Sequence, residues 1–164
     1  MTIFATPGPT WNAMIAALDD DAPDENWAFK LVLQCRDHTR LALQMEESAE
    51  VIGPAITEWN RDPGARTPRR LDAAPPRRGT KDIAGGPHGP QGSYKGWHVL
   101  LGTLIGNEFE DARKMTPTWT RSLYMEDPWT VPRPGMTDHQ IRTTTPDWLS
   151  ERGVYVSDRD LGEQ

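Results

Sequence analysis

Residues 97–112 read WHVLLGTLIGNEFEDA, and this stretch decides the fold of the chain. Its apolar side chains recur every three or four positions, at Trp97, Leu100, Leu101, Leu104, Ile105, Phe109 and Ala112. That spacing places them on one face of an α-helix, which must be buried against another element. Because the residue before a proline is disfavoured in the helical conformation, Pro117 sets the limit of this segment. We therefore predict a helix over residues 97–115.

A second stretch has the same period and supplies the partner for the first. Its apolar positions are Trp27, Leu31, Cys35, Leu41, Met45, Ala49 and Ile52. Asn26 is the expected N-cap, and Gly53-Pro54 should end the helix because proline lacks an amide donor and clashes with the preceding turn. The sequence thus predicts a mainly α-helical fold, in which helices near 27–52 and 97–115 form a small core.

The composition indicates long irregular segments around that core. The chain of 164 residues is the size of one domain, but only 36% of it is hydrophobic, and it contains 15 prolines and 14 glycines. We expect an N-terminal arm with a short helix over 1–26 and the first part of the core over 27–59. A basic Pro/Gly-rich linker or insertion should follow over 60–96. A helix and a Trp-Pro arm over 97–164 then complete the same domain.

Charge and cysteine content bear on where the protein works. A single cysteine cannot form an internal disulfide, which fits a reducing cytoplasm. We find neither a signal-peptide pattern nor an apolar run near the roughly 18 residues of a membrane span, so a cytoplasmic protein without membrane insertion is expected. The net charge of -6 disfavours nonspecific binding of nucleic acid by the chain as a whole.

The last third of the chain is predicted to lie across the core. Prolines between residues 119 and 145 exclude a long helix there, so this part should run extended. A two-turn helix is expected over 146–152, with Gly153 as its left-handed stop and an extended piece over 154–156. Trp119, Trp129 and Trp148 lie beside prolines in this arm, and they either dock onto a groove of the same protein or contact a partner.

The linker is locally basic in an acidic chain. Arg69, Arg70, Arg77 and Arg78 stand out within the segment 61–81. The segment is either a solvated linker attracted to the acidic body or a site for nucleic acid or an acidic partner. The absence of interleaved aromatic residues for base stacking favours the first interpretation.

An acidic helix gives the alternative catalytic hypothesis. Glu46, Glu47 and Glu50 resemble the EExxE helix of all-α MazG-like nucleotide pyrophosphohydrolases, and Glu108 with Asp111 could stand for the later ExxD of that family. The resemblance implies that these carboxylates bind Mg²⁺, which would neutralise a triphosphate during attack by water. Such a helix also occurs as an ordinary solvated face, and the long Gly/Pro-rich gap before Glu108 departs from the family pattern.

A different resemblance covers the C-terminal part. The elements are Pro117-Thr118-Trp119-Thr120, Asp127-Pro128-Trp129, Thr145-Pro146 and Arg152-Gly153-Val154-Tyr155-Val156. Their order resembles little-characterised actinobacterial antitoxin-like and regulator-associated proteins, some of them companions of nucleotidyltransferase-type toxins. The resemblance implies a non-enzymatic antitoxin-like or regulatory protein that binds a protein partner, and it provides no catalytic residues or cofactor.

These hypotheses assign different residues to the site. For a partner-binding protein, the candidate residues are Trp119, Trp129, Trp148, Arg69, Arg70, Arg77 and Arg78. A third class, a structural subunit of a phage particle or another assembly, is suggested by the long arms.

Overall fold

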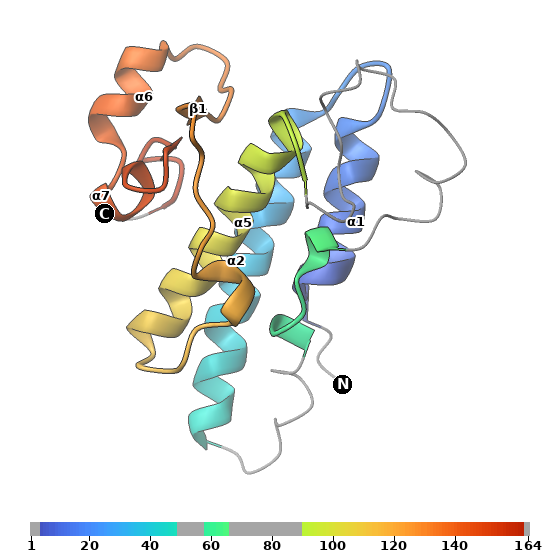
Figure 1. The fold of residues 1–164 in the computed structure, drawn as a ribbon, viewed down its shortest axis with the longest axis vertical. Helices are drawn as coiled ribbons and strands as arrows, with labels where there is room; N and C mark the ends of the chain where they lie inside the picture. Colours follow the sequence, from blue (N-terminus) through green and yellow to red (C-terminus); the bar gives the residue numbers. More distant parts are fainter. Residues whose placement is uncertain (1–3, 49–57, 66–89, 163–164) are drawn as a thin grey trace.

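The computed structural model describes residues 4–48, 58–65 and 90–162, without the side chains of residues 46–48 and 65 (Figure 1). It confirms a mainly α-helical fold. The α-helices are α1 (Pro7–Leu18), α2 (Glu25–Ser48), α5 (Ser93–Asp111), α6 (Asp138–Thr144) and α7 (Asp147–Ser150). Short 3₁₀ helices, η1 (Pro63–Ala65) and η2 (Thr118–Thr120), and two strands, β1 (Trp129–Thr130) and β2 (Val154–Tyr155), complete the described elements.

Helix α2 packs against α1 on one side and α5 on the other, and this arrangement forms the core. The short helix expected within residues 1–26 is α1, which begins at Pro7 because proline is well suited to the first turn of a helix. It buries Trp11, Met14, Ile15 and Leu18, which lie three or four positions apart. The N-terminal segment is therefore part of the core.

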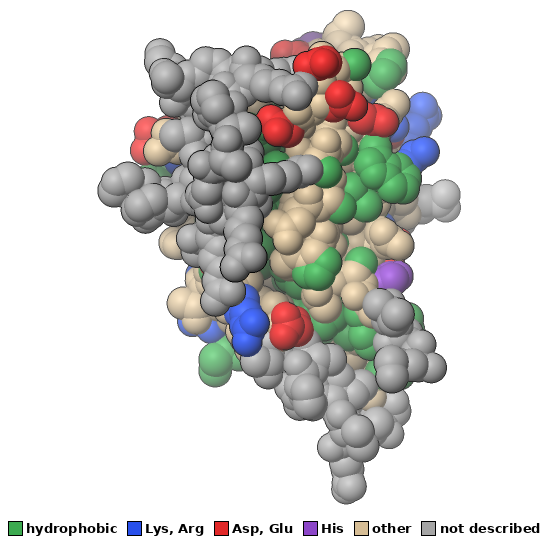
Figure 2. All heavy atoms as spheres, turned by 90° about the vertical axis from the view of Figure 1, so that its right-hand side faces the viewer, with side chains coloured by type: hydrophobic (Ala, Val, Ile, Leu, Met, Phe, Trp, Pro, Cys, Tyr) green, Lys and Arg blue, Asp and Glu red, His purple; other side chains and the backbone are tan. Residues whose placement is uncertain are grey.

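Helix α2 begins two residues earlier than predicted. The cap is Asp24 instead of Asn26, since the Asp24 Oδ1 accepts a hydrogen bond of 2.9 Å from the Trp27 amide. Asp20, Asp21 and Asp24 are exposed in the α1–α2 connection, and Figure 2 shows acidic side chains gathered at that end of the molecule. The predicted end of the helix at residue 52 lies outside the described residues.

Helix α5 is the central element and is buried along most of its length. It begins at Ser93 and ends at Asp111, so the predicted range of 97–115 is shifted by one turn toward the C-terminus. The helix ends before Pro117 can act, because Arg113 adopts a left-handed conformation with φ 58°. The Lys114 amide then donates to the Phe109 carbonyl, which closes the last turn.

The C-terminal arm contains more regular structure than predicted. Strand β1 pairs in parallel with β2, and α6 and α7 lie in the connection between them. The expectation that residues 119–145 run extended was wrong for α6, which begins with a reciprocal capping box between Thr137 and Gln140. Helix α7 is shorter than the predicted 146–152, but Gly153 has the expected left-handed conformation, with φ 74°.

None of the described helices is of the membrane-spanning kind. Within residues 4–48, 58–65 and 90–162, no helix has both the length and the apolar character needed to cross a membrane.

Candidate functional site

Two glycines of α5 let the C-terminal arm lie close to the helix. A Cβ added at Gly96 would lie 2.3 Å from Cδ2 of Trp129, and one at Gly102 would lie 2.3 Å from Cδ1 of Leu123. Real Cβ atoms do not come so close to other atoms, so a side chain at either position would force the ring of Trp129 or the side chain of Leu123 to move. The Trp129 ring then packs edge-on against Trp97, with 5.2 Å between ring centroids. The arm is thereby fixed along α5.

Trp119 belongs to the inner packing of the protein. Its ring stacks on His98, with a centroid distance of 5.5 Å and an interplanar angle of 19°. Its Nε1 donates a hydrogen bond of 2.8 Å to the Trp59 carbonyl. His98 is itself buried, and its Nε2 lies 2.8 Å from Oδ1 of Asp62. Trp119 and Trp129, which sequence reasoning nominated for partner binding, both pack against the core of their own chain.

Trp148 also packs against the core, and it lines a cleft between α5 and the arm. Trp148 is partly buried. It is the second residue of α7. The cleft has a volume of about 400 Å³. Helix α5 contributes Thr103, Gly106, Asn107 and Glu110, and the arm contributes Thr116, Thr120, Arg121, Trp148, Glu151 and Arg152.

Arginine side chains build the arm side of this cleft. The Nη1 of Arg152 donates to three backbone carbonyls, those of Thr120 at 3.3 Å, Arg121 at 3.1 Å and Leu123 at 2.7 Å. Arg121 donates from Nε to the Thr116 hydroxyl at 3.0 Å and from Nη2 to the Thr116 carbonyl at 2.8 Å. These bonds hold the irregular chain around η2 in place, because a guanidinium offers donors in a rigid fork.

The helix side of the cleft contains an unsatisfied polar atom. The Oγ1 of Thr103 is buried without a hydrogen-bond partner in the structure, and the residue is 6% exposed. A buried hydroxyl without a partner costs free energy, about 1–3 kcal/mol, so its presence calls for an explanation. Glu110 and Glu151 are exposed at the same cleft, and neither carboxylate forms an ion pair with another described side chain. The exposed groups of the cleft are therefore the two carboxylates, whereas the Thr103 hydroxyl is shielded from solvent.

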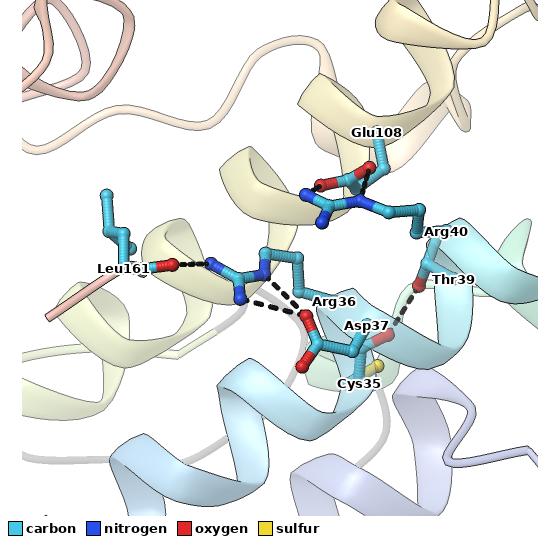
Figure 3. Close-up of polar contacts among 7 residues, drawn as sticks. All are labelled: Cys35, Arg36, Asp37, Thr39, Arg40, Glu108 and Leu161. Atoms are coloured by element: carbon cyan, nitrogen blue, oxygen red, sulfur yellow. Dashed lines mark hydrogen bonds and ion pairs between the residues drawn. The ribbon is translucent and has the colours of Figure 1, made fainter. Parts of the chain in front are cut away.

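Glu108, one of the carboxylates of the magnesium hypothesis, forms an ion pair with Arg40. Glu108 is buried, and both of its carboxylate oxygens accept hydrogen bonds from Arg40 of α2, at 2.6 and 2.9 Å (Figure 3). The Arg40 side chain is 48% exposed, so the pair lies at the edge of the core. Beside it is a second hollow of about 350 Å³ that Asp111 also lines. A metal ion at Glu108 would have to displace the guanidinium.

Asp111 lies with Glu108 at that hollow, whereas the three glutamates of the acidic motif near the end of α2 have no described side chains. Glu46 and Glu47 belong to α2, but their side chains lie outside the description, and Glu50 lies outside the described residues altogether. Among the side chains that are described, no group of three or more His, Cys, Asp or Glu residues is arranged to hold a metal ion. The magnesium site stays a prediction.

The arginines of the basic segment 61–81 that were proposed to bind a partner are not among the described residues. Arg69, Arg70, Arg77 and Arg78 all lie outside the described residues. From the same segment, Arg61 is exposed, and its Nη1 lies 4.0 Å from Oε1 of Glu58. The proposed contact of this segment with nucleic acid likewise stays a prediction.

Cys35 is held in the core of the protein. Burial raises the pKa of its thiol to about 12, against a reference of 9.0, although hydrogen bonding with Thr10 and Thr39 acts in the opposite direction. A thiol reacts as its thiolate, so Cys35 is unreactive near neutral pH. Its burial agrees with the place of Cys35 among the apolar positions that predicted the helix near 27–52.

Sequence reasoning missed several residues that hold α2 to other parts of the fold. The indole of Trp59 donates a hydrogen bond of 2.7 Å to the Thr39 hydroxyl, which donates in turn to the Cys35 carbonyl at 2.6 Å. Arg36 donates from Nη1 to the Leu161 carbonyl at 2.6 Å and ties the end of the arm to α2 (Figure 3). The interruption of an apolar stripe by glycines at 96 and 102 was the available signal for close packing of another segment.

Comparisons of this chain with protein-family models, with curated proteins and with solved structures found no match.

Proposed function

We propose that this chain is a non-enzymatic protein-binding module, an antitoxin-like or regulatory partner of a cytoplasmic protein such as a nucleotidyltransferase-type toxin. The partner binds at the cleft between α5 and the arm. The observation that carries this proposal is a cleft whose wall is fixed by Arg121 and Arg152 and whose lining includes the exposed carboxylates of Glu110 and Glu151, which form no ion pair with another described side chain. A rigid surface with unused polar groups is suited to recognition, because little conformational entropy is lost on binding.

Two observations on Glu108 and Cys35 favour binding over catalysis by these side chains. Both oxygens of Glu108 are occupied by Arg40, which competes with any cation for that carboxylate. The pKa of Cys35 is raised by burial, which keeps the thiol protonated at neutral pH. Trp148 is the candidate aromatic residue that lines the cleft, and tryptophan is enriched among residues that contribute most to binding energy.

The proposal is tested by site-specific photocrosslinking in cells that contain the native partner. A benzophenone side chain is introduced at Glu151, at the edge of the cleft, and in a matched variant at Lys30, which is exposed on α2. We expect one discrete protein adduct from position 151 and none from position 30. The same adduct in both variants, or no adduct from position 151, would contradict a partner site at the cleft.

A further inference from the structure

We propose that the exposed face of α2 binds the same face of a second copy of this chain, with the two helices antiparallel. The face consists of Trp27, Lys30, Gln34, Asp37 and Leu41, and we call it the α2 face. None of these residues lines the cleft between α5 and the arm, so the pairing holds or fails independently of the proposed function.

Helix α2 uses only part of its circumference within the chain. Its buried residues face α1 and α5, which are the elements that pack most extensively against it (Figure 1). On the remaining side, Trp27 is 51% exposed and Leu41 is 43% exposed. They lie two heptads apart with Gln34 midway, so the three residues fall on one line along the helix. Large apolar side chains aligned in this way indicate an interaction surface, whereas exposed apolar residues scattered singly do not.

Two charged residues beside this line determine which occupant fits. Lys30 and Asp37 flank the line on the same side, and both are exposed. Arg36 donates to Asp37 from Nε at 3.0 Å and from Nη2 at 2.8 Å, and both bonds end at Oδ1, so Oδ2 can accept a further donor (Figure 3). Lys30 forms no ion pair with another described side chain. The α2 face thus presents one cation and one anion, and a copy of the same face supplies the complement of each.

An antiparallel arrangement satisfies both charges at once. When a two-fold axis passes beside Gln34, Trp27 of one copy lies against Leu41 of the second copy. Lys30 and Asp37 of the second copy then differ by only one residue in height, about 1.5 Å along the helix. Two equivalent ion pairs result, because a two-fold interface repeats every contact. A parallel pair would place each charge opposite its own copy, and like charges oppose association.

The size of the face sets the strength of the pairing. The distance along the helix from Trp27 to Leu41 is about 21 Å, at about 1.5 Å per residue. One helix from each copy makes an interface at the small end of the known range, and the net charge of -6 on each copy opposes association. We therefore expect a weak dimer in exchange with the monomer, stabilised by burial of the two apolar side chains and oriented by the ion pairs.

Sedimentation velocity of the full-length chain at concentrations up to about 1 mM tests the pairing. We expect the sedimentation coefficient to rise with concentration from that of a monomer toward that of a dimer. Lys30→Glu and Asp37→Lys each replace two attractions by two repulsions, and each should weaken the dimer about ten-fold or more. An equimolar mixture of these two variants should restore it, because every pair across the axis then joins opposite charges. Lys114→Glu makes the same change of charge at an exposed lysine outside α2 and should associate like the original chain.

Cysteine substitutions test the position of the axis. Gln34→Cys should form a disulfide between two copies under mild oxidation, because the two thiols meet beside the axis. Leu41→Cys should not, since in the antiparallel arrangement its two thiols are about 21 Å apart, which no disulfide spans. The native Cys35 is buried and does not take part.

A chain that stays monomeric up to about 1 mM would overturn the proposal, and so would a dimer that neither charge reversal weakens. If Leu41→Cys crosslinks as readily as Gln34→Cys, the antiparallel arrangement is wrong. Should circular dichroism show that Asp37→Lys is unfolded, the comparison of Lys30→Glu with Lys114→Glu decides. The benzophenone variant at position 30 lacks Lys30 and therefore both ion pairs, so it is monomeric and remains a control for the cleft.

Discussion

Substitution of Gly96 by alanine tests whether contact with α5 fixes the C-terminal arm. An added Cβ would lie 2.3, 2.5 and 2.8 Å from three ring carbons of Trp129, whereas ordinary contact begins near 3.4 Å. The ring would have to move by about 1.1 Å, the difference between 2.3 and 3.4 Å. Because Trp129 also packs on Trp97 and pairs through its backbone with Val154, that movement disturbs both contacts.

The expected loss of stability follows from two opposing terms. Overpacking of this kind costs about 1–3 kcal/mol, and replacing glycine by alanine inside a helix returns up to about 1 kcal/mol. We expect Gly96→Ala to lower the free energy of unfolding by about 1–2 kcal/mol, and Tm by about 2–8 °C for a chain of this size. Urea unfolding followed by tryptophan fluorescence and thermal unfolding followed by circular dichroism measure these quantities.

Gly8 provides a matched control for this substitution. It is also helical, in α1, and an added Cβ there meets nothing within 4 Å. Gly8→Ala should therefore stabilise the protein slightly, by about 0.4–1 kcal/mol. In a Trp129→Ala background, Gly96→Ala should lose its penalty. If Gly96→Ala is as stable as Gly8→Ala, or destabilises equally without the Trp129 ring, the steric argument is refuted.

Three further predictions concern other contacts. Arg40→Ala should destabilise the protein by about 1–2 kcal/mol, which is less than the cost of breaking a fully buried pair because the guanidinium is half in water. Adding Glu108→Gln should restore part of this loss, as measured by urea unfolding of the double variant. If the double variant is no more stable than Arg40→Ala, the loss of stability comes from lost packing of the Arg40 side chain and not from the ion pair. In the folded chain the Cys35 thiol has a pKa of about 12, above the reference of 9.0. Its contribution to the free energy of unfolding is therefore complete below pH 9.0 and declines between pH 9.0 and about 12. Above pH 9.0 the free energy of unfolding should fall less steeply with pH for Cys35→Ala than for the original chain. Identical slopes would contradict the raised pKa. Thr137→Ala removes the hydroxyl that caps α6 and should cost about 1 kcal/mol, with Thr143→Ala on the same helix as a control of smaller effect in thermal unfolding.

The sequence pattern identified the core helices because their apolar period is strong. Leu100, Leu101, Leu104 and Ile105 are all buried in α5, as their spacing predicts. The ends of the helices were less accurate, since they depend on local backbone geometry. The left-handed Arg113 ends α5, and a positive φ at a residue other than glycine leaves no clear signal in a sequence.

Part of what was missed in the arm could have been read from the chain. Thr137 and Gln140 have the spacing of a capping box, which marks the start of α6. The cleft itself could not be anticipated, because it is built from α5 and from residues 116–152 that meet only in three dimensions. Trp148 was singled out as an aromatic residue beside a proline, whereas Arg152 gains its role from tertiary hydrogen bonding alone.

The two-residue parallel ladder between β1 and β2 has a consequence for the dynamics of the arm. So short a ladder is not stable alone, and it depends on the support of α5 beneath it. Local opening can therefore release the amides of Trp129 and Val131, which donate to Gly153 and Tyr155, while α1, α2 and α5 remain folded. A molecule bound against Trp148 and Arg152 would oppose that opening, so slower hydrogen exchange of the Trp129 and Val131 amides would report that the cleft is occupied.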